Sequence, residues 1–400
     1  MAKLRFERLE RQSPTGWTVI GLLILLLAVG LGAALYMEEH GHIVTGMNNQ
    51  IVWGLPHVFA VFLIVAASGA LNVASLSSVF NRAVYKPYGR LSGILAVTLL
   101  VGGLAVLVLD LGRPERLLVA MTSYNFRSIF AWNIFLYSGF ALIVGAYLFS
   151  MMDRRASQAA WVGKTMGLIA FVWRLVLTTG TGSIFGFLAA RAAYYGAIMA
   201  PLFIAASFLY GLAFMVLVLV AVGRETGREM MTEEVADRFR GLLSIFSLSL
   251  LYFTIVHYLT KFYAGGQQGV VVFVLRDGGV YTLVFWLGQI LCGTLLPLAL
   301  LAWGRNSASA RRALPLASIL FLIGGLAQLY VTIIGGQAYP LELFPGVGVS
   351  SSFFDGVVAN YRPSLPELLL GVSGVALALL LTTLAVRLMP FLPTVQTAES

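Results

Sequence analysis

Ten long apolar runs constrain this 400-residue chain more than any other feature of its sequence. A helix needs about 20 mostly apolar residues to cross a bilayer, and the runs have that length. They are apolar on all sides, whereas helices of soluble proteins keep a polar face. The sequence therefore predicts an all-α integral membrane protein with ten transmembrane helices. The predicted spans are Trp17–Met37, Pro56–Val79, Leu91–Asp110, Phe130–Met152, Thr165–Leu188, Pro201–Gly223, Leu242–Tyr263, Val280–Trp303, Ala313–Gly335 and Leu368–Met389.

The composition agrees with this class. Only 11% of the residues are charged and 59% are hydrophobic, while a globular domain carries about 25% charged residues. The first run follows a basic segment, as a signal peptide does, but it is longer than a signal-peptide core of about 7–15 residues. We therefore expect it to be retained as a helix.

The basic residues predict the orientation of the chain. Of the 26, 18 fall at one side of the predicted spans, Arg174 lies inside the fifth span, and seven fall at the other side. Because basic loops stay in the cytoplasm, the richer side is predicted to be cytoplasmic, with both termini inside the cell. The net charge of +9 is then a topology signal in an inner-membrane protein, and a role in binding nucleic acid is not expected. The seven are Arg113, Arg116, Arg127, Arg191, Lys261, Arg276 and Arg362.

The sequence offers little for a resident metal. The single cysteine, Cys292, excludes an internal disulfide and an iron–sulfur cluster of its own, which needs about four thiolates. His40 and His42 lie close together but lack further spaced ligands, so we expect an exposed loop there. Only His57 and His257 lie at matching depth in the spans, so a cytochrome b interpretation is weak. No haem is expected.

Polar residues gather near the outer ends of consecutive spans. His57 lies at the outer end of the second span, and Asp110 closes the third. Ionisable residues in or near spans are costly, so they are by default candidates for function. The other members of this cluster are Arg113, Arg127, Trp132 and Asn133.

This cluster suits a quinone headgroup. Oxidising or reducing a quinone moves two electrons and two protons, so its oxygens need a hydrogen-bonding group such as His57 and a proton carrier such as Asp110. The isoprenoid tail needs an apolar slot, which bundled helices supply. Taken alone, His57 fits an interfacial packing residue and Asp110 fits a partner of Arg113.

Three further ionisable residues are candidates for a proton relay. Arg174 lies near the middle of the fifth span, where an unpaired charge is expensive. His257 and Lys261 are four residues apart on one face of the seventh span. Alternatively, these two side chains extend their polar ends to the membrane–water interface and have no role in proton transfer.

The motifs Asp110-Leu-Gly-Arg-Pro-Glu-Arg116, Asn125-Phe-Arg-Ser128 and Trp132-Asn133 resemble the NrfD/PsrC family of quinone-interacting membrane subunits. The stretches Trp53–Ser75 and Met121–Asn133 are similar to the DsrP branch of that family, the membrane subunits of DsrMKJOP complexes associated with sulfite reduction. The resemblance covers nearly the whole chain.

The resemblance implies a single transmembrane domain over residues 1–400. Residues 56–188 would form a four-helix bundle with the quinone site, residues 201–335 a second bundle, and 17–37 and 368–389 would flank them. It also implies that His57 and Asp110 contact menaquinone or ubiquinone. The implied partners are a periplasmic ferredoxin-like iron–sulfur subunit, a multihaem cytochrome c, and a haem-b membrane subunit with a cytoplasmic iron–sulfur subunit.

Two other functions stay open at this point. A secondary transporter would need a polar site near the bilayer midplane on broken helices, and Arg174 with the neighbouring threonines is the candidate for it. A structural anchor would only recruit electron carriers, and His57 and Asp110 would then be dispensable. Because the chain has no carboxylate deep inside a span, protons are expected to exchange at the outer face only.

Overall fold

In the computed structural model of the chain, the described residues are all except 1–4, 11–12, 154–159, 304–306, 342–355 and 395–400. Lys3, Arg11, Arg154, Arg155 and Arg305, which belong to the basic residues of the richer side, lie outside them. Within the described residues, ten helices of 24 to 31 residues are long and apolar enough to cross a membrane. At 1.5 Å per residue they span about 36 Å or more, which exceeds the hydrocarbon core of a bilayer. The expected all-α membrane fold is confirmed.

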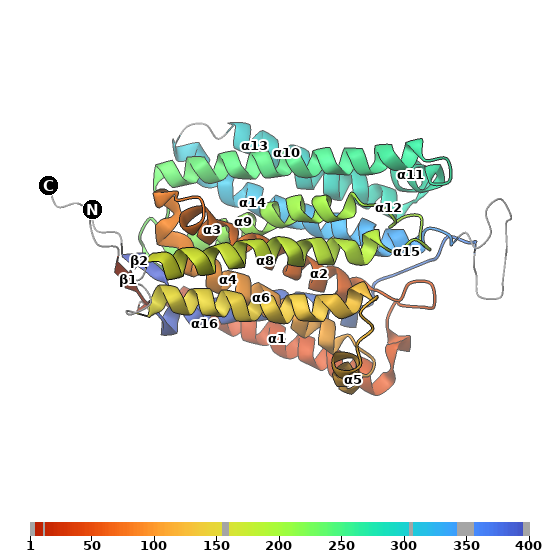
Figure 1. Cartoon of the computed structure of the whole chain (residues 1–400), viewed down its shortest axis with the longest axis horizontal. Coiled ribbons are helices and arrows are strands. Elements are labelled where there is room, and N and C mark those ends of the chain that lie inside the picture. Colours follow the sequence, from red (N-terminus) through yellow and green to blue (C-terminus); the bar gives the residue numbers. More distant parts are fainter. Residues whose placement is uncertain (1–4, 11–12, 154–159, 304–306, 342–355, 395–400) are drawn as a thin grey trace.

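Within the described residues, six spans are single helices, the third joins η2 (Ala83–Tyr88) to α4 (Gly89–Leu109), and three are broken (Figure 1). The single helices are α1 (Pro14–His40), α6 (Ile129–Met152), α8 (Ala160–Gly186), α9 (Met199–Thr226), α10 (Glu233–Tyr263) and α16 (Leu365–Leu388). The broken ones are α2 (Leu55–Ala70) with α3 (Asn72–Ser78), α12 (Val280–Leu283) with η5 (Val284–Leu295) and α13 (Leu296–Trp303), and α14 (Ser307–Tyr330) with η6 (Val331–Gly335) and α15 (Gly336–Ala338). Both η5 and η6 are π-helical.

Short elements lie at the ends of the spans. They are β1 (Arg5–Glu7), η1 (His42–Val44), η2 (Ala83–Tyr88), η3 (Pro114–Arg116), α5 (Leu117–Thr122), α11 (Gln268–Val272), η4 (Phe273–Asp277) and β2 (Leu392–Thr394). Strands β1 and β2 pair antiparallel, with Arg5 opposite Thr394 and Glu7 opposite Leu392. We call the end of the molecule that carries the first residues of α2 the site end; β1 and β2 lie at the opposite end (Figure 1).

The helices pack in two closed rings. In one, α2, α4, α6 and α8 follow one another, and α8 returns to α2. In the other, α9 contacts α10 and α14, and the η5–α13 span closes the ring between them. Helices α1 and α16 pack together beside α4 and α2. The two rings meet where α2 crosses α9.

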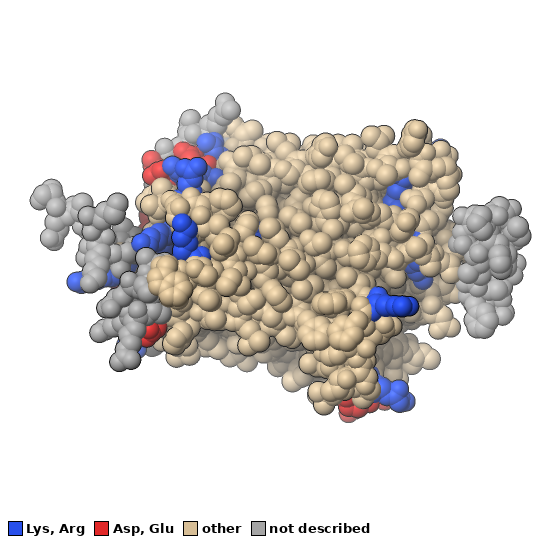
Figure 2. All heavy atoms as spheres, in the orientation of Figure 1, with Lys and Arg blue, Asp and Glu red and all other residues tan. Residues whose placement is uncertain are grey.

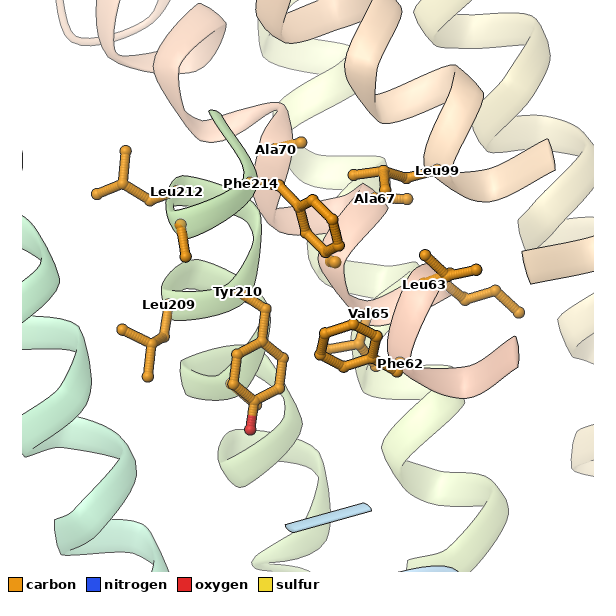
Figure 3. Packing of buried hydrophobic residues seen from close by; sticks show 14 of the residues in the cluster. Phe62, Leu63, Val65, Ala67, Ala70, Leu99, Leu209, Tyr210, Leu212 and Phe214 are labelled. Carbon is orange, nitrogen blue, oxygen red and sulfur yellow. The ribbon is translucent and has the colours of Figure 1, made fainter. Parts of the chain in front are cut away.

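Helix α2 lies at the centre of the molecule. Every residue of its apolar window is buried inside the protein, and Phe62 contacts Tyr210 and Phe214 of α9 with ring centroids 5.5 and 5.8 Å apart (Figure 3). A helix that is apolar on all sides must be surrounded by apolar neighbours, and α2 is surrounded by protein. The position of His57, on the first turn of α2, is therefore fixed by the core.

One helix boundary differs clearly from the expectation. The seventh span begins at Glu233, nine residues before the predicted Leu242. The Thr232 side chain accepts a hydrogen bond from the Val235 amide and caps the helix. A charged turn therefore extends the helix beyond the apolar run, which a search for apolar residues alone does not detect.

Charged residues gather at the two ends of the molecule, and few interrupt the belt between them on the face seen in Figure 2. Together with the ten spans, this distribution identifies a multi-pass membrane protein of the cell membrane.

Candidate functional site: an imidazole–carboxylate pair beside an apolar cavity

His57 and Asp110 form a direct pair at the site end. His57 lies on the first turn of α2, which starts after Gly54 and carries Pro56 in that turn. Asp110 follows the last residue of α4. Because α2 and α4 pack side by side, the His57 Nδ1 and Asp110 Oδ2 atoms come within 2.8 Å. The expected juxtaposition of an imidazole and a carboxylate is present.

Asp110 is the buried member of the pair. Its side chain is 1% exposed, whereas that of His57 is 19% exposed. The other carboxylate oxygen, Oδ1, is buried without a hydrogen-bond partner among the described residues. On the main chain, the Asp110 carbonyl oxygen contacts Nε2 of His42 at 2.9 Å. His42 is therefore half-buried against the site rather than in the exposed loop that the sequence suggested.

A cavity of about 460 Å³ opens beside His57. Its walls come from α2, α4 and α6, and are completed by α5, the end of α8 and η6. The rim reaches the surface, because Phe130 and Met121 are 44% and 37% exposed. Ligand pockets of this kind measure about 300–1,000 Å³ and carry a few polar groups in apolar walls. The residues that line it are Trp53, His57, Ala60, Val61, Ile64, Leu104, Leu107, Val108, Leu111, Leu117, Met121, Phe130, Asn133, Ile134, Tyr137, Ser138, Ile184, Phe185 and Ile333.

Asn133 supplies a second polar group to this cavity. Its Nδ2 donates to the carbonyl oxygens of Ile129 and Gly180 at 2.9 and 3.3 Å. Its Oδ1 is buried, and no described residue donates to it. Since a buried acceptor without a partner costs about 1–3 kcal/mol, this oxygen is suited to accept a hydrogen bond from a ligand hydroxyl.

Trp53 lies against the His57 ring and is held by a clamp. The two ring centroids are 6.2 Å apart with planes 23° from parallel. Gln337 of α15 accepts hydrogen bonds from the Val52 and Trp53 amides at 3.0 Å each and donates to the Trp53 carbonyl at 2.9 Å. Arg191 in turn donates to the Gln337 carbonyl at 2.9 Å. The backbone before α2 is thus fixed by residues far away in the sequence.

The start of α2 is also tied to α16. The Leu55 amide donates to the Tyr361 hydroxyl at 2.7 Å, and that hydroxyl donates to Oε1 of Glu367 at 2.7 Å. Burial and the nearby Glu367 carboxylate raise the pKa of Tyr361 above its ordinary value, so it stays a neutral donor. Glu367 also accepts from the Gly46 and Ser364 amides. These bonds satisfy a helix-start amide that would otherwise lack a partner.

The structure does not bring all the predicted quinone ligands to the cavity. Arg113 and Arg127 are exposed, and Trp132 is 46% exposed and donates its Nε1–H to the Phe126 carbonyl. None of these three lines the cavity described above, and neither does Asp110, which reaches it only through His57. They lie on the surface at the site end, and the cavity wall is built instead by residues one turn away on α6, such as Tyr137.

The predicted relay residues lie apart from this site. Lys261 donates from Nζ to the carbonyls of Ala192 and Tyr195 and to Oε1 of Gln267, at 2.6, 3.0 and 3.2 Å. His257 is 7% exposed, and its Nδ1 has no partner in the described part of the chain.

Arg174 is 1% exposed and lies between two aromatic rings. The centroids of the Phe171 and Phe208 rings are 4.8 Å from its guanidinium carbon. Its Nε and Nη1 are buried, and no described residue accepts a hydrogen bond from them. Cation–π contacts of this kind stabilise a desolvated arginine by about 2 kcal/mol or more.

Several lining residues were not selected from the sequence. Trp53 comes from the loop before α2, and Tyr137, Phe185 and Ile333 come from three different helices. Tyr137 follows Asn133 by four residues and therefore lies on the same helix face, a spacing that could have identified it. Nothing local marks Phe185 or Ile333, because helix packing alone brings them to the cavity.

Within the described residues, no group of three or more His, Cys, Asp or Glu side chains is placed to hold a metal ion. The candidate site comprises the His57–Asp110 pair, the Asn133 oxygen and the apolar walls. This set can bind a flat, lipophilic molecule with polar oxygens at one end and exchange protons with it.

Comparison with known proteins places the chain in a family. The family model described as "Polysulphide reductase, NrfD" matches residues 43–340. The chain is 28% identical to the "Hdr-like menaquinol oxidoreductase integral membrane subunit" of Archaeoglobus fulgidus, over 98% of this chain and 97% of that protein. It is also 28% identical to a putative dimethyl sulfoxide reductase membrane subunit of Halobacterium salinarum, over 94% of this chain and 91% of that protein. A polysulfide reductase polypeptide of Wolinella succinogenes is 24% identical, over 73% of this chain and 96% of its own length. The family match spans both rings of helices, which we also call the first bundle (α2, α4, α6 and α8, with the cavity) and the second bundle (α9, α10, α14 and the η5–α13 span). The chain therefore belongs to the NrfD family of membrane proteins.

Proposed function

We propose that the chain is the quinone-binding membrane subunit of a respiratory electron-transfer complex. The observation that carries the proposal is that His57, which lines an apolar cavity, is paired with the buried Asp110 carboxylate behind it. The ring of a quinone needs polar partners for its oxygens, and its tail needs apolar walls. The cavity offers both at one end of the bundle.

The geometry supports a proton role for His57. In the neutral form, Nδ1–H donates to Asp110 and leaves Nε2 to accept a proton. A quinol that becomes a quinone loses two electrons and two hydroxyl protons. We propose that Nε2 takes one of these protons, while the Asp110 carboxylate stabilises the imidazolium that forms. The unpaired Asn133 oxygen accepts a hydrogen bond from the other hydroxyl, and we propose that the proton of that hydroxyl is released to water at the site end.

The electrons require a partner, because the chain has one cysteine and so cannot build a cluster alone. We propose an iron–sulfur subunit docked at the site end, which faces the periplasm in the predicted orientation. The relative from Archaeoglobus fulgidus is named as a menaquinol oxidoreductase subunit, and this favours menaquinol over ubiquinol. We further propose that the complex is of the Dsr type and also contains a multihaem cytochrome c and a haem-b membrane subunit.

A binding measurement tests the cavity. The full chain in lipid nanodiscs is titrated with a soluble menaquinone analogue, and the Kd is obtained for the wild type and two tryptophan variants. Ile134→Trp fills the cavity, since Ile134 lines it; Leu142→Trp places the same ring on the same helix, where the side chain is 75% exposed.

We expect Ile134→Trp to weaken binding at least about tenfold, which corresponds to about 1.4 kcal/mol, and Leu142→Trp to leave the Kd unchanged. Equal affinity in both variants would place the ligand elsewhere. Absence of binding in the wild-type chain would favour the structural anchor, and uptake of a polar solute by proteoliposomes would favour the transporter.

A further inference from the structure

The interior of the second bundle is polar at the depth of His257. Thr254 and His257 come from α10, and Gln289 comes from η5; all three are at most 8% exposed. Gln328 of α14 and Tyr210 of α9 are 3% and 1% exposed. Burying so many polar groups in a membrane protein is costly unless each finds a hydrogen-bond partner.

One of these groups lacks a protein partner. The His257 Nδ1 atom is buried and unpaired within the described residues. The Gln289 backbone carbonyl accepts a hydrogen bond from the Thr294 hydroxyl at 3.1 Å. Tyr210 does have a partner, because its hydroxyl donates to Oε1 of Gln328.

Two small cavities lie among the same side chains. The first, of about 30 Å³, is lined by His257, and the second, of about 10 Å³, by Tyr210. Thr254, Gln289 and Gln328 line both. One buried water needs about 10–15 Å³ of such space and two to four polar partners. The first cavity therefore has room for two water molecules and the second for one.

The helices are distorted where these cavities lie. Gln289 is in the middle of η5, and Val331 and Thr332, which line the first cavity, are in η6. Both segments are π-helical, a rare form that is frequent at functional sites. The two small cavities therefore lie beside irregular helix turns.

We infer that the second bundle holds a buried file of water molecules from His257 to Tyr210, and that the His257 ring exchanges protons with these waters. Lys261, one turn farther along α10 toward the site end, donates hydrogen bonds to the Ala192 and Tyr195 carbonyls. Tyr258 is the other titratable side chain at the first cavity. Among the described residues, no carboxylate lines either cavity. This inference does not depend on quinone binding.

Radiolytic labelling with hydroxyl radicals, read by mass spectrometry, tests the water file. Radicals generated from a bound water oxidise the side chain beside it. Tyr210 and Tyr147 form a matched pair, since they are 1% and 2% exposed and only Tyr210 lines a cavity. In the full chain in nanodiscs we expect Tyr210 to be labelled at least about five times faster than Tyr147. Equal slow labelling of both in the wild-type chain would overturn the inference.

The variant Gln289→Leu removes a water partner from both cavities. We expect it to slow the labelling of Tyr210 at least threefold and leave Tyr147 unchanged. Hydrogen–deuterium exchange at carbon 2 of the His257 ring supplies the proton readout, and it should slow severalfold in the same variant. If this variant does not fold, the wild-type rates decide alone: no exchange at His257 over days in D₂O would contradict the proton access.

Discussion

At the scale of single residues, the site depends on one hydrogen bond. Asp110 accepts from Nδ1 of His57 at 2.8 Å, which selects the tautomer that leaves Nε2 to meet a ligand. The carboxylate is buried, so its hydrogen bond is shielded from competing water. Its own carbonyl is held by His42. This hydrogen bond thereby fixes the orientation of the imidazole that we propose as the proton acceptor.

The first prediction concerns this pair. In the complete complex with its partner subunits, His57→Ala and Asp110→Asn should each lower quinol oxidation at least about 100-fold, because general-base catalysis contributes about 10²–10⁴. Steady-state turnover in membranes measures this. His40→Ala is the matched control, since His40 contacts only the Tyr36 carbonyl and ring of its own helix among the described residues. Unchanged turnover in a fully assembled Asp110→Asn complex would refute the role.

At the scale of elements, the crossing of α2 and α9 holds the two bundles together. A Cβ added at Gly69 would lie 1.5 Å from the Ser207 carbonyl oxygen, and one at Gly211 would lie 2.0 Å from the Ala70 amide nitrogen. Both contacts involve backbone, which cannot move aside as a flexible side chain can. Small residues let membrane helices approach this closely.

The second prediction follows from this crossing. Gly211→Ala should lower the Tm of the full chain in detergent by several degrees, because overpacking costs about 1–3 kcal/mol or more. Gly145→Ala is the control on α6, where an added Cβ meets nothing within 4 Å, and it should leave the Tm unchanged or slightly raised. Equal melting of the two variants would show that the crossing is not tight.

The elements also show what a sequence can and cannot predict. The spans were predictable because a bilayer demands long apolar runs. The closeness of His57 and Asp110 was predictable because these residues lie at the same end of two neighbouring runs. The break at Leu71 and the π-helical turns of η5 could not be predicted, because they do not change the apolar character of the run. The clamp by Gln337 joins residues more than 280 positions apart, and such contacts arise from packing alone. The cavity walls on α8 and η6 were missed for the same reason.

At the scale of the whole molecule, the asymmetry of basic residues predicts that the site end faces outward. The structure places charges at both ends of the apolar belt (Figure 2), and the excess at the end of β1 and β2 then lies in the cytoplasm.

The third prediction tests this orientation with single cysteines in a Cys292→Ser background. Glu10 and Arg276 form a matched pair, since their side chains are 76% and 75% exposed at opposite ends. A membrane-impermeant maleimide should label Arg276→Cys in intact spheroplasts and Glu10→Cys only after lysis. The reverse pattern would invert the topology and move the proposed quinone site to the cytoplasmic face.

The central claim is that a quinone binds in the first bundle beside His57, and photo-crosslinking tests it most directly. A photoreactive menaquinone analogue is irradiated with the full chain in nanodiscs, and the labelled peptides are identified by mass spectrometry. Crosslinks should fall on the cavity walls, in residues 53–64, 104–111 and 130–138, and unlabelled menaquinone should compete them away. Competed crosslinks confined to the second bundle, around His257 and Gln289, would contradict the account.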